Sequence, residues 1–164
     1  MKRSKTIFMF LTIFTMVLLF GCKPETTPST LKPKDKTISI ILNTQTEIFW
    51  YIDEAGKDAE NKKANRKDKI SWVCRDENGK KLEFEIQFKD NKSPVIACNP
   101  NESKCNVDAV ITDPIKSGSS GHINLWITPS AKVPRGDYPY AIRIDINGKK
   151  FSVDPKVIIP DPRS

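Results

Sequence analysis

Residues 82–88 read Leu-Glu-Phe-Glu-Ile-Gln-Phe, an unbroken alternation of apolar and polar side chains. Successive side chains of a β-strand point to opposite sides of a sheet, so this period of two predicts a strand with one buried face. Residues 123–127 (Ile-Asn-Leu-Trp-Ile) and 142–146 (Ile-Arg-Ile-Asp-Ile) alternate in the same way. These three stretches predict sheets that have one face covered by a core and the other in water.

The chain around these stretches has the same character. Asn78-Gly79 and Asn147-Gly148 lie between strand-like runs and predict hairpins, because type I′ turns need two residues with positive φ. Nine or ten short strands, separated by Pro and Gly, predict an all-β sandwich or barrel over residues 37–164. The further strands are expected at residues 37–42, 47–52, 70–74, 94–98, 107–111, 150–153 and 156–159.

Residues 53–69 are strongly charged, and their apolar members are three alanines. Such a segment has no apolar stripe, so we expect a long charged loop that does not pack firmly against a core. Its basic end is a candidate patch for anionic lipid or nucleic acid. A solvated loop is favoured and no nucleic-acid partner is expected, because acidic residues dilute these charges and no aromatic residue lies among them. The basic residues are Lys62, Lys63, Arg66, Lys67 and Lys69.

The N-terminus has the pattern of a secretory signal peptide. Residues 1–5 carry three positive charges and no acid, and residues 7–20 are uncharged. As a helix this apolar run would be about 21 Å long, whereas a bilayer core is roughly 30 Å thick. The run therefore predicts a leader rather than a transmembrane anchor.

The four residues after the apolar run are Leu19-Phe20-Gly21-Cys22. They resemble the lipobox of bacterial lipoproteins, and this resemblance implies a signal peptide over residues 1–21, cleavage before Cys22 and a diacylglycerol on the Cys22 thiol. Two or more acyl chains make membrane attachment stable, whereas one does not. The alternative is an ordinary secreted protein in which Cys22 is a free or disulfide-bonded thiol.

Residues 22–36 are rich in Pro, Thr and charge, which predicts a lipidated flexible tether. Lys23 follows the cysteine in place of the Asp that marks inner-membrane retention in enteric lipoproteins. We therefore expect a lipid-anchored protein of the bacterial cell envelope, with the outer membrane favoured. Removing Lys2, Arg3 and Lys5 with the leader lowers the net charge from +7 to +4, an unremarkable value for the mature chain.

Two further segments resemble the cupredoxin-like sandwich. Lys67-Asp-Lys-Ile-Ser-Trp72 is similar to that fold's entry into a central strand, and Val133-Pro-Arg-Gly-Asp-Tyr-Pro-Tyr140 is similar to its approach to the last strands. The resemblance implies an all-β Greek-key sandwich of cupredoxin-like or immunoglobulin-like type. Ala141 stands where copper-carrying members have Cys, and the mature chain has one His and no Met. A blue-copper site needs two imidazoles and a thiolate, so we expect no copper and no other cofactor.

Three cysteines besides Cys22 occur in a chain destined for an oxidising compartment. Cys98 and Cys105 are separated by six residues that include Pro100, enough to turn between two strands, and we expect them to form a disulfide. Cys74 lies beside Trp72 in an apolar strand and would then be a buried small apolar residue. A pairing of Cys74 with Cys98 or Cys105 across the sandwich is the alternative.

No catalytic or metal-binding constellation is evident in the sequence. It contains no GxSxG, HExxH, P-loop or paired CxxC motif, and its one histidine, His122, would have to serve any Cys-His or Ser-His mechanism alone. His122, Asn124 and Trp126 share one side of a predicted strand, opposite three aliphatic residues. We therefore expect an exposed surface for an envelope protein or a small ligand there, with Trp126 as its most exposed aromatic residue.

These observations favour a non-enzymatic envelope lipoprotein that acts as a binding or structural module. One alternative is a periplasmic metal-binding or redox protein that recruits a metal through His122 and nearby carboxylates. A second alternative is a hydrolase inhibitor that presents residues 99–104 or 116–121 as a surface loop.

Overall fold

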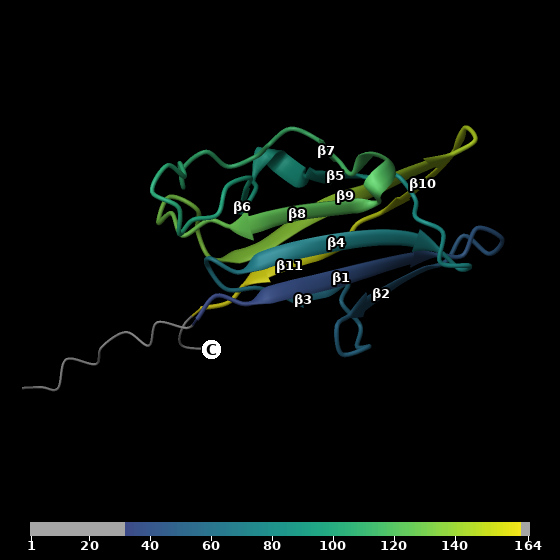
Figure 1. Cartoon of the computed structure of the whole chain (residues 1–164), viewed down its shortest axis with the longest axis horizontal. Helices are drawn as coiled ribbons and strands as arrows, with labels where there is room; N and C mark the ends of the chain where they lie inside the picture. Colours follow the sequence, from purple (N-terminus) through teal and green to yellow (C-terminus); the bar gives the residue numbers. More distant parts are fainter. Residues whose placement is uncertain (1–31, 162–164) are drawn as a thin grey trace, which may run out of the picture. The chain divides into compact units, whose positions relative to one another are not determined.

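The computed structural model describes residues 32–161, which form two β-sheets packed face to face (Figure 1). The described residues form strands and short 3₁₀ turns, and no α-helix occurs among them. The strands are β1 (Asp35–Leu42), β2 (Phe49–Asp53), β3 (Asn61–Lys63), β4 (Lys69–Asp76), β5 (Glu85–Phe88), β6 (Val95–Ile96), β7 (Ile115–Lys116), β8 (His122–Ile127), β9 (Gly136–Ile146), β10 (Lys149–Val153) and β11 (Lys156–Ile159). The prediction of an all-β fold is therefore confirmed.

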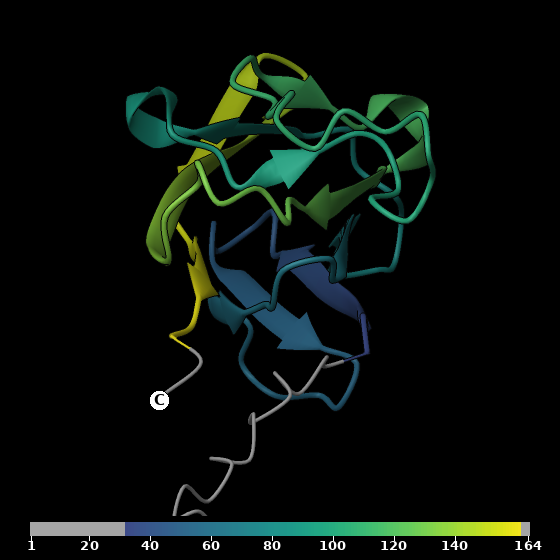
Figure 2. The ribbon, with the colours of Figure 1, turned by 90° about the vertical axis from the view of Figure 1, so that its left-hand side faces the viewer.

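The two sheets are mixed. The five-stranded sheet has the order β2-β1-β4-β8-β6, and the six-stranded sheet has the order β3-β11-β9-β5-β7, with β10 paired to β9. The β1–β4 and β3–β11 pairs are parallel. From β2 to β9 each new strand joins the sheet opposite to the strand before it. The chain thus crosses repeatedly between the layers, which Figure 2 shows from the side.

Alternating burial follows the alternating sequence in the central strands. In β8 the residues Ile123, Leu125 and Ile127 are buried, and the three residues between them are more exposed. The ladder of β5, however, begins at Glu85, and the first three residues of the predicted strand belong to the segment that crosses from β4. Leu82 and Phe84 are still buried there. The period of two therefore predicted burial correctly but not the length of the ladder.

Two hairpin signals have different outcomes. Asn147 and Gly148 have φ values of 54° and 83°, and they join β9 to β10 as the predicted two-residue turn. Asn78-Gly79 also forms a turn, closed by a hydrogen bond from the Asp76 N–H to the Lys80 carbonyl. A single bridge, Arg75 to Lys81, follows it before the chain leaves for the other sheet. That second prediction was right about the turn and wrong about the hairpin.

The expectation of a loosely packed loop at residues 53–69 was wrong. This segment contains β3, and Ala59 and Ala64 are each 1% exposed within the core. Lys62 is also buried, with its Nζ 3.1 Å from Asp53 Oδ2. The small alanine side chains are buried without an apolar stripe, and the lysine stem packs along apolar surface while its ammonium group meets carboxylates. An apolar stripe was therefore not needed for this segment to pack.

Two other strand assignments differ from the prediction. Residues 107–111 form a turn followed by irregular backbone instead of a strand, because Asn106 Oδ1 accepts the Asp108 N–H and the Asp108 carboxylate is bonded to Ser130. The two-residue strand β7 was not predicted. At the N-terminal boundary β1 begins at Asp35, two residues before the predicted start of the domain.

The predicted signal peptide, Cys22 and most of the tether lie outside the described residues. Within residues 32–161 no helix is long and apolar enough to cross a membrane.

The centre of the core is an aromatic contact between the sheets. Trp72 of β4 and Tyr140 of β9 are both fully buried, and their rings meet edge to face with centroids 6.0 Å apart. The Trp72 Nε1–H donates a hydrogen bond to Tyr140 Oη at 3.0 Å. Phe88 packs on Tyr140 with a centroid separation of 5.4 Å. The indole N–H thereby finds its partner in the opposite sheet, which buried Trp residues require.

We predict that Tyr140→Phe lowers the free energy of unfolding by about 1–3 kcal/mol, because it leaves the buried Trp72 N–H without an acceptor. Urea denaturation followed by Trp fluorescence measures the change. Tyr51→Phe is the matched control, since the Tyr51 hydroxyl is buried without a hydrogen-bond partner among the described residues. Its removal should leave stability unchanged or raise it, and equal losses in both variants would contradict the assignment.

Candidate binding surface

One face of the five-stranded sheet is turned away from the core and is covered by no other element in Figure 1. We call it the outer face. Its members are partly or fully exposed, whereas the residues that alternate with them in β1, β4 and β8 are buried. The outer face consists of Trp50 and Ile52 from β2, Asp35, Thr37, Ser39 and Ile41 from β1, Lys69, Ser71, Val73 and Arg75 from β4, and His122, Asn124 and Trp126 from β8.

The strand register places the three residues predicted from β8 on this face. Asn124 lies opposite Ser71, and the Ser71 hydroxyl is 2.6 Å from Asn124 Oδ1. Trp126 lies opposite Lys69, whose Nζ is 5.8 Å from the centre of the indole ring. Lys69 over the ring holds the indole against the sheet and leaves Trp126 only partly exposed. The predicted grouping of His122, Asn124 and Trp126 on one side of β8 is thus present in the structure.

The most exposed aromatic residue of the outer face is Trp50, which the sequence analysis did not select. Trp50 is 44% exposed and lies opposite Ile41, and the neighbouring Ile48 is 50% exposed. The expectation that Trp126 is the most exposed aromatic residue was therefore wrong. Residues 49–52 are Phe-Trp-Tyr-Ile, so β2 has no apolar-polar alternation that would show which ring points outward. The pairing of β2 with β1 alone decides it.

His122 lies at the start of β8, where Gly121 determines the path of the chain. Gly121 has a φ of 62°, and a Cβ there would come within 3.2 Å of the carbonyl oxygens of Cys74 and Leu82. The Gly121 carbonyl accepts a hydrogen bond from the Cys74 N–H at 3.0 Å, and the His122 N–H donates to Ser120 Oγ. Within residues 32–161 no group of three or more His, Cys, Asp or Glu side chains could hold a metal ion.

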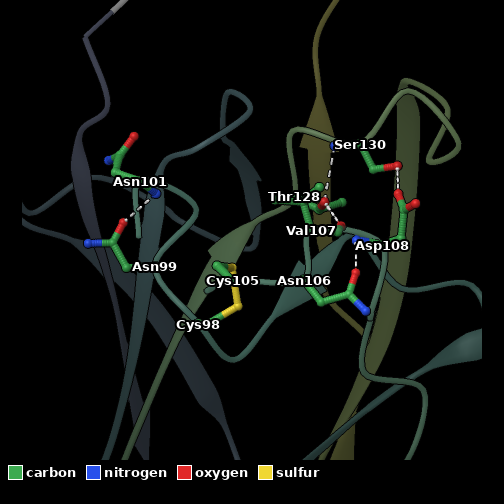
Figure 3. Close-up of a disulfide and its surroundings, with 9 residues drawn as sticks. All are labelled: Cys98, Asn99, Asn101, Cys105, Asn106, Val107, Asp108, Thr128 and Ser130. Carbon is green, nitrogen blue, oxygen red and sulfur yellow. Dashed lines mark hydrogen bonds between the residues drawn. A yellow bond between two sulfur atoms is a disulfide. The ribbon is translucent and has the colours of Figure 1, made fainter. Parts of the chain in front are cut away.

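The predicted disulfide is present. Cys98 and Cys105 are bonded, and the segment that follows is attached to the chain after β8 (Figure 3). The Thr128 hydroxyl donates to the Val107 carbonyl, and the Ser130 hydroxyl donates to an Asp108 carboxylate that also pairs with Lys132. These two hydrogen bonds fix residues 107 and 108, which follow the disulfide-closed loop, to the chain after β8. Residues 101–104 are exposed at its end.

Cys74 is the third cysteine, and it is a free thiol in the core. Burial raises the pKa of the Cys74 thiol to about 12. Because the thiolate is the reactive form, this environment makes the sulfur a poor nucleophile at neutral pH. The prediction that Cys74 is a buried small apolar residue is confirmed.

The basic residues of 53–69 do not form one patch. Arg66 donates hydrogen bonds to the carbonyl oxygens of Pro129, Ser130 and Val133, and so binds the start of β4 to the connection between β8 and β9. Lys62 is buried against Asp53, and Lys69 covers Trp126. Asp68 is 1% exposed, and its carboxylate accepts the backbone N–H groups of Lys34 and Asn65. The charges of this segment therefore serve mainly to connect the fold.

Comparisons with known proteins add little to this description. No protein-family model and no curated protein matches the chain. Among solved structures, the chain is similar to the crystal structure of an inclusion body protein, PixA, from Burkholderia cenocepacia J2315. The sequence identity is 9% and the TM-score is 0.42, with 80% of this chain and 99% of that chain covered. A likeness at this level carries no argument about function.

We predict that replacing Cys98 and Cys105 together by Ser lowers the free energy of unfolding by about 2.5 kcal/mol. Without the disulfide, the unfolded chain regains the conformational entropy that closing a loop of this length removes. Urea denaturation with and without reductant measures it. Reductant should destabilise the native protein by the same amount and leave the double variant unchanged. A reductant effect on the double variant would place the sensitive group elsewhere.

Proposed function

We propose that the protein is a lipid-anchored binding module of the bacterial cell envelope. The proposal rests on the sequence Leu19-Phe20-Gly21-Cys22 at the end of an apolar leader, followed by a Pro- and Thr-rich tether. The Cys98–Cys105 disulfide supports it, since disulfides persist in the oxidising compartments outside the cytoplasm. Acylation of Cys22 would hold the domain at a membrane surface, with the outer membrane favoured.

We further propose that the sandwich is a copper-free, cupredoxin-like Greek-key domain. Trp72 and Tyr140, which end the two motifs that carry the resemblance, meet in the core. Tyr138 of the second motif donates its hydroxyl hydrogen to the Pro134 carbonyl within the same motif. These contacts support a structural role for both motifs, and Ala141 leaves the copper-binding cysteine of the family without a counterpart. The fold type by itself implies no activity.

The binding role is assigned to the outer face. Lys69 and the exposed Asp35 and Arg75 carry its charges, and the part around Trp50, Ile41, Ile52 and Val73 is apolar apart from Arg75, which lies opposite Ile41. Trp50 and Trp126 lie about 25 Å apart, as estimated from strand spacings of roughly 4.8 Å and a rise of roughly 3.3 Å per residue. A small ligand cannot reach both rings. The proposed occupant is therefore an envelope protein that presents a surface with both polar and apolar parts.

The direction of β1 supports a partner other than the lipid surface. The chain enters the domain at Asp35, and Trp50 lies beside Ile41 near the other end of the strand. The intervening residues separate the two ends by about 20 Å. The apolar part of the outer face is therefore remote from the point where the tether joins the fold. This distance favours contact with a protein over insertion of Trp50 into the anchoring membrane.

A second candidate function is inhibition of a hydrolase by the loop of residues 99–104. The observation that favours it is the closure of this exposed loop by the Cys98–Cys105 disulfide. A rigid exposed loop lowers the entropy cost of binding in an enzyme cleft. Residues 116–121, the other predicted loop, contain a short 3₁₀ turn (η3, Gly118–Ser120) and the buried Ser117, so they form a less protruding surface. Metal recruitment by His122 has no comparable support.

We predict that Cys22→Ser abolishes lipid attachment and leader cleavage, because the thiol is the acceptor of the diacylglycerol in the proposed pathway. Metabolic labelling with a fatty acid, fractionation and intact mass measure the outcome. Cys74→Ser, a substitution in the domain, is the control and should leave labelling intact. A Cys22→Ser protein that still loses its leader and sediments with membranes would contradict the proposal.

We predict that a photo-crosslinking residue at Asn124 captures one defined envelope protein, and that Trp50→Ala or Trp126→Ala removes the adduct. Both tryptophans lie outside the core, so the melting temperature should fall by no more than a few degrees. The same photo-crosslinker at Ser152, an exposed position in the six-stranded sheet, is the matched control. An adduct with the mass of two copies of this chain, or equal adducts from both positions, would overturn the assignment.

A further inference from the structure

A cavity of about 680 Å³ opens where the edge of β2 faces the turn between β10 and β11. Phe49 and Tyr51 of β2 form part of its wall, with their rings stacked 6.5 Å apart. These two residues occupy the inward positions of β2, whereas Trp50 belongs to the outer face. Trp50 and Ile52 of the outer face also line the cavity, so it lies at the β2 edge, where the outer face meets the space between the two sheets. Its volume lies within the range of small-molecule sites.

Four carboxylates line this cavity, and its lining contains no Lys or Arg. They are Glu47, Asp58, Glu60 and Asp154, which come from three separate segments of the chain. Two of them are neutralised at the rim, because Glu47 pairs with Lys149 at 2.6 Å and Asp154 pairs with Lys89 at 2.8 Å. For Asp58 and Glu60 the described part of the chain supplies no ion pair. Two formal negative charges therefore remain beside the aromatic wall.

One of the aromatic residues, Tyr51, has a buried hydroxyl group without a hydrogen-bond partner among the described residues. Tyr51 Oη is inaccessible to solvent, and no hydrogen-bond partner for it exists within residues 32–161. Burial is the main cause of a raised pKa for this phenol, and Tyr140, Glu60 and Asp154 raise it further. The side chain is thus neutral and lies within electrostatic reach of two of the four carboxylates.

We propose that this cavity binds a small organic ammonium ion of the alkylamine class. Aromatic faces attract cations, and carboxylates accept the N–H groups of a primary ammonium. Asp58 and Glu60 supply the uncompensated charge, while Phe49 and Tyr51 supply the ring faces. A simple metal cation would not need the aromatic wall, and an anion would be repelled.

The alkylammonium group has two sources, a free di- or polyamine and a lysine side chain of a peptide. Both present the same primary ammonium on an unbranched aliphatic stem. The probes are therefore spermidine and Nα-acetyl-lysine amide, with choline as a quaternary ammonium that cannot donate N–H bonds. Spermidine binding without acetyl-lysine binding assigns a polyamine, and binding of both assigns the ammonium group itself.

The test uses the purified full-length protein, with isothermal titration calorimetry and two-dimensional amide NMR as readouts. We expect saturable spermidine binding at millimolar concentrations or below, with shifts confined to β2, residues 57–60 and the β10–β11 turn. The Asp58→Asn, Glu60→Gln double variant should weaken binding at least tenfold. Glu102→Gln with Asp113→Asn is the matched control, because both carboxylates are exposed, lie outside the cavity lining and change the net charge equally.

The aromatic contribution is tested separately by Phe49→Leu, which removes the ring and keeps an apolar side chain. It should weaken spermidine binding several-fold, and the melting temperature shows whether the variant folds. Equal loss in the double variant and its control would reveal a general charge effect and overturn the site, as would binding of choline as strong as that of spermidine. Absence of any spermidine binding to the native protein at millimolar concentration also overturns it. Trp126→Ala should leave spermidine binding unchanged, because Trp126 lies outside the cavity lining, so this variant tests partner binding by the outer face separately from the cavity.

Discussion

The hydrogen bond between Trp72 and Tyr140 is the interaction on which the rest of the architecture depends. It joins the central strand of one sheet to the long strand of the other, and both side chains are completely buried. The indole N–H has one possible donor direction, so its acceptor fixes how the sheets are placed over each other. Aliphatic side chains such as Ile70 and Ile142 surround this contact without imposing a comparable direction. The non-directional core therefore supplies most of the stabilisation and the aromatic pair supplies the alignment.

The repeated crossing between layers has consequences for the connections. Because consecutive strands from β2 to β9 join opposite sheets, each loop between them must cross the sandwich and satisfy its own polar groups there. Asp68 does this for the residues before β4 by accepting two backbone N–H groups, and Arg66 does it for three carbonyls of the β8–β9 connection. Charged residues in a crossing segment are thus structural. The many charges of residues 53–69 had suggested a solvated loop. A sequence alone does not show whether a charged side chain hydrogen-bonds to backbone groups or to water.

The parts of the structure that the sequence predicted are those in which local pattern and environment agree. The alternation in 123–127 and 142–146 gave both the strand and its buried side, and Cys98 and Cys105 are close enough in sequence for their pairing to be inferred. β3 was missed because a buried lysine and two small alanines do not resemble a buried strand. Trp50 was not singled out as exposed because Phe49, Trp50 and Tyr51 are alike in character, and only the pairing with β1 shows which of them points outward. The cavity is beyond sequence reasoning altogether, since its wall joins residues near position 50 to residues near 154.

The position of β2 at the edge of its sheet explains why two distinct surfaces meet there. An interior strand has both faces defined by neighbours, whereas β2 pairs fully with β1 on one side and with a single bridge, Ile52 to Asp58, on the other. Its outward residue Trp50 therefore lacks a neighbouring strand that would shield it, and its inward residues Phe49 and Tyr51 are covered incompletely by the opposite sheet. Natural sheets usually protect such edges with charge or a covering loop. Here the carboxylates of Asp58 and Glu60 provide the charge but leave the aromatic wall open, which makes a neutralising cation a more fitting occupant than an apolar segment.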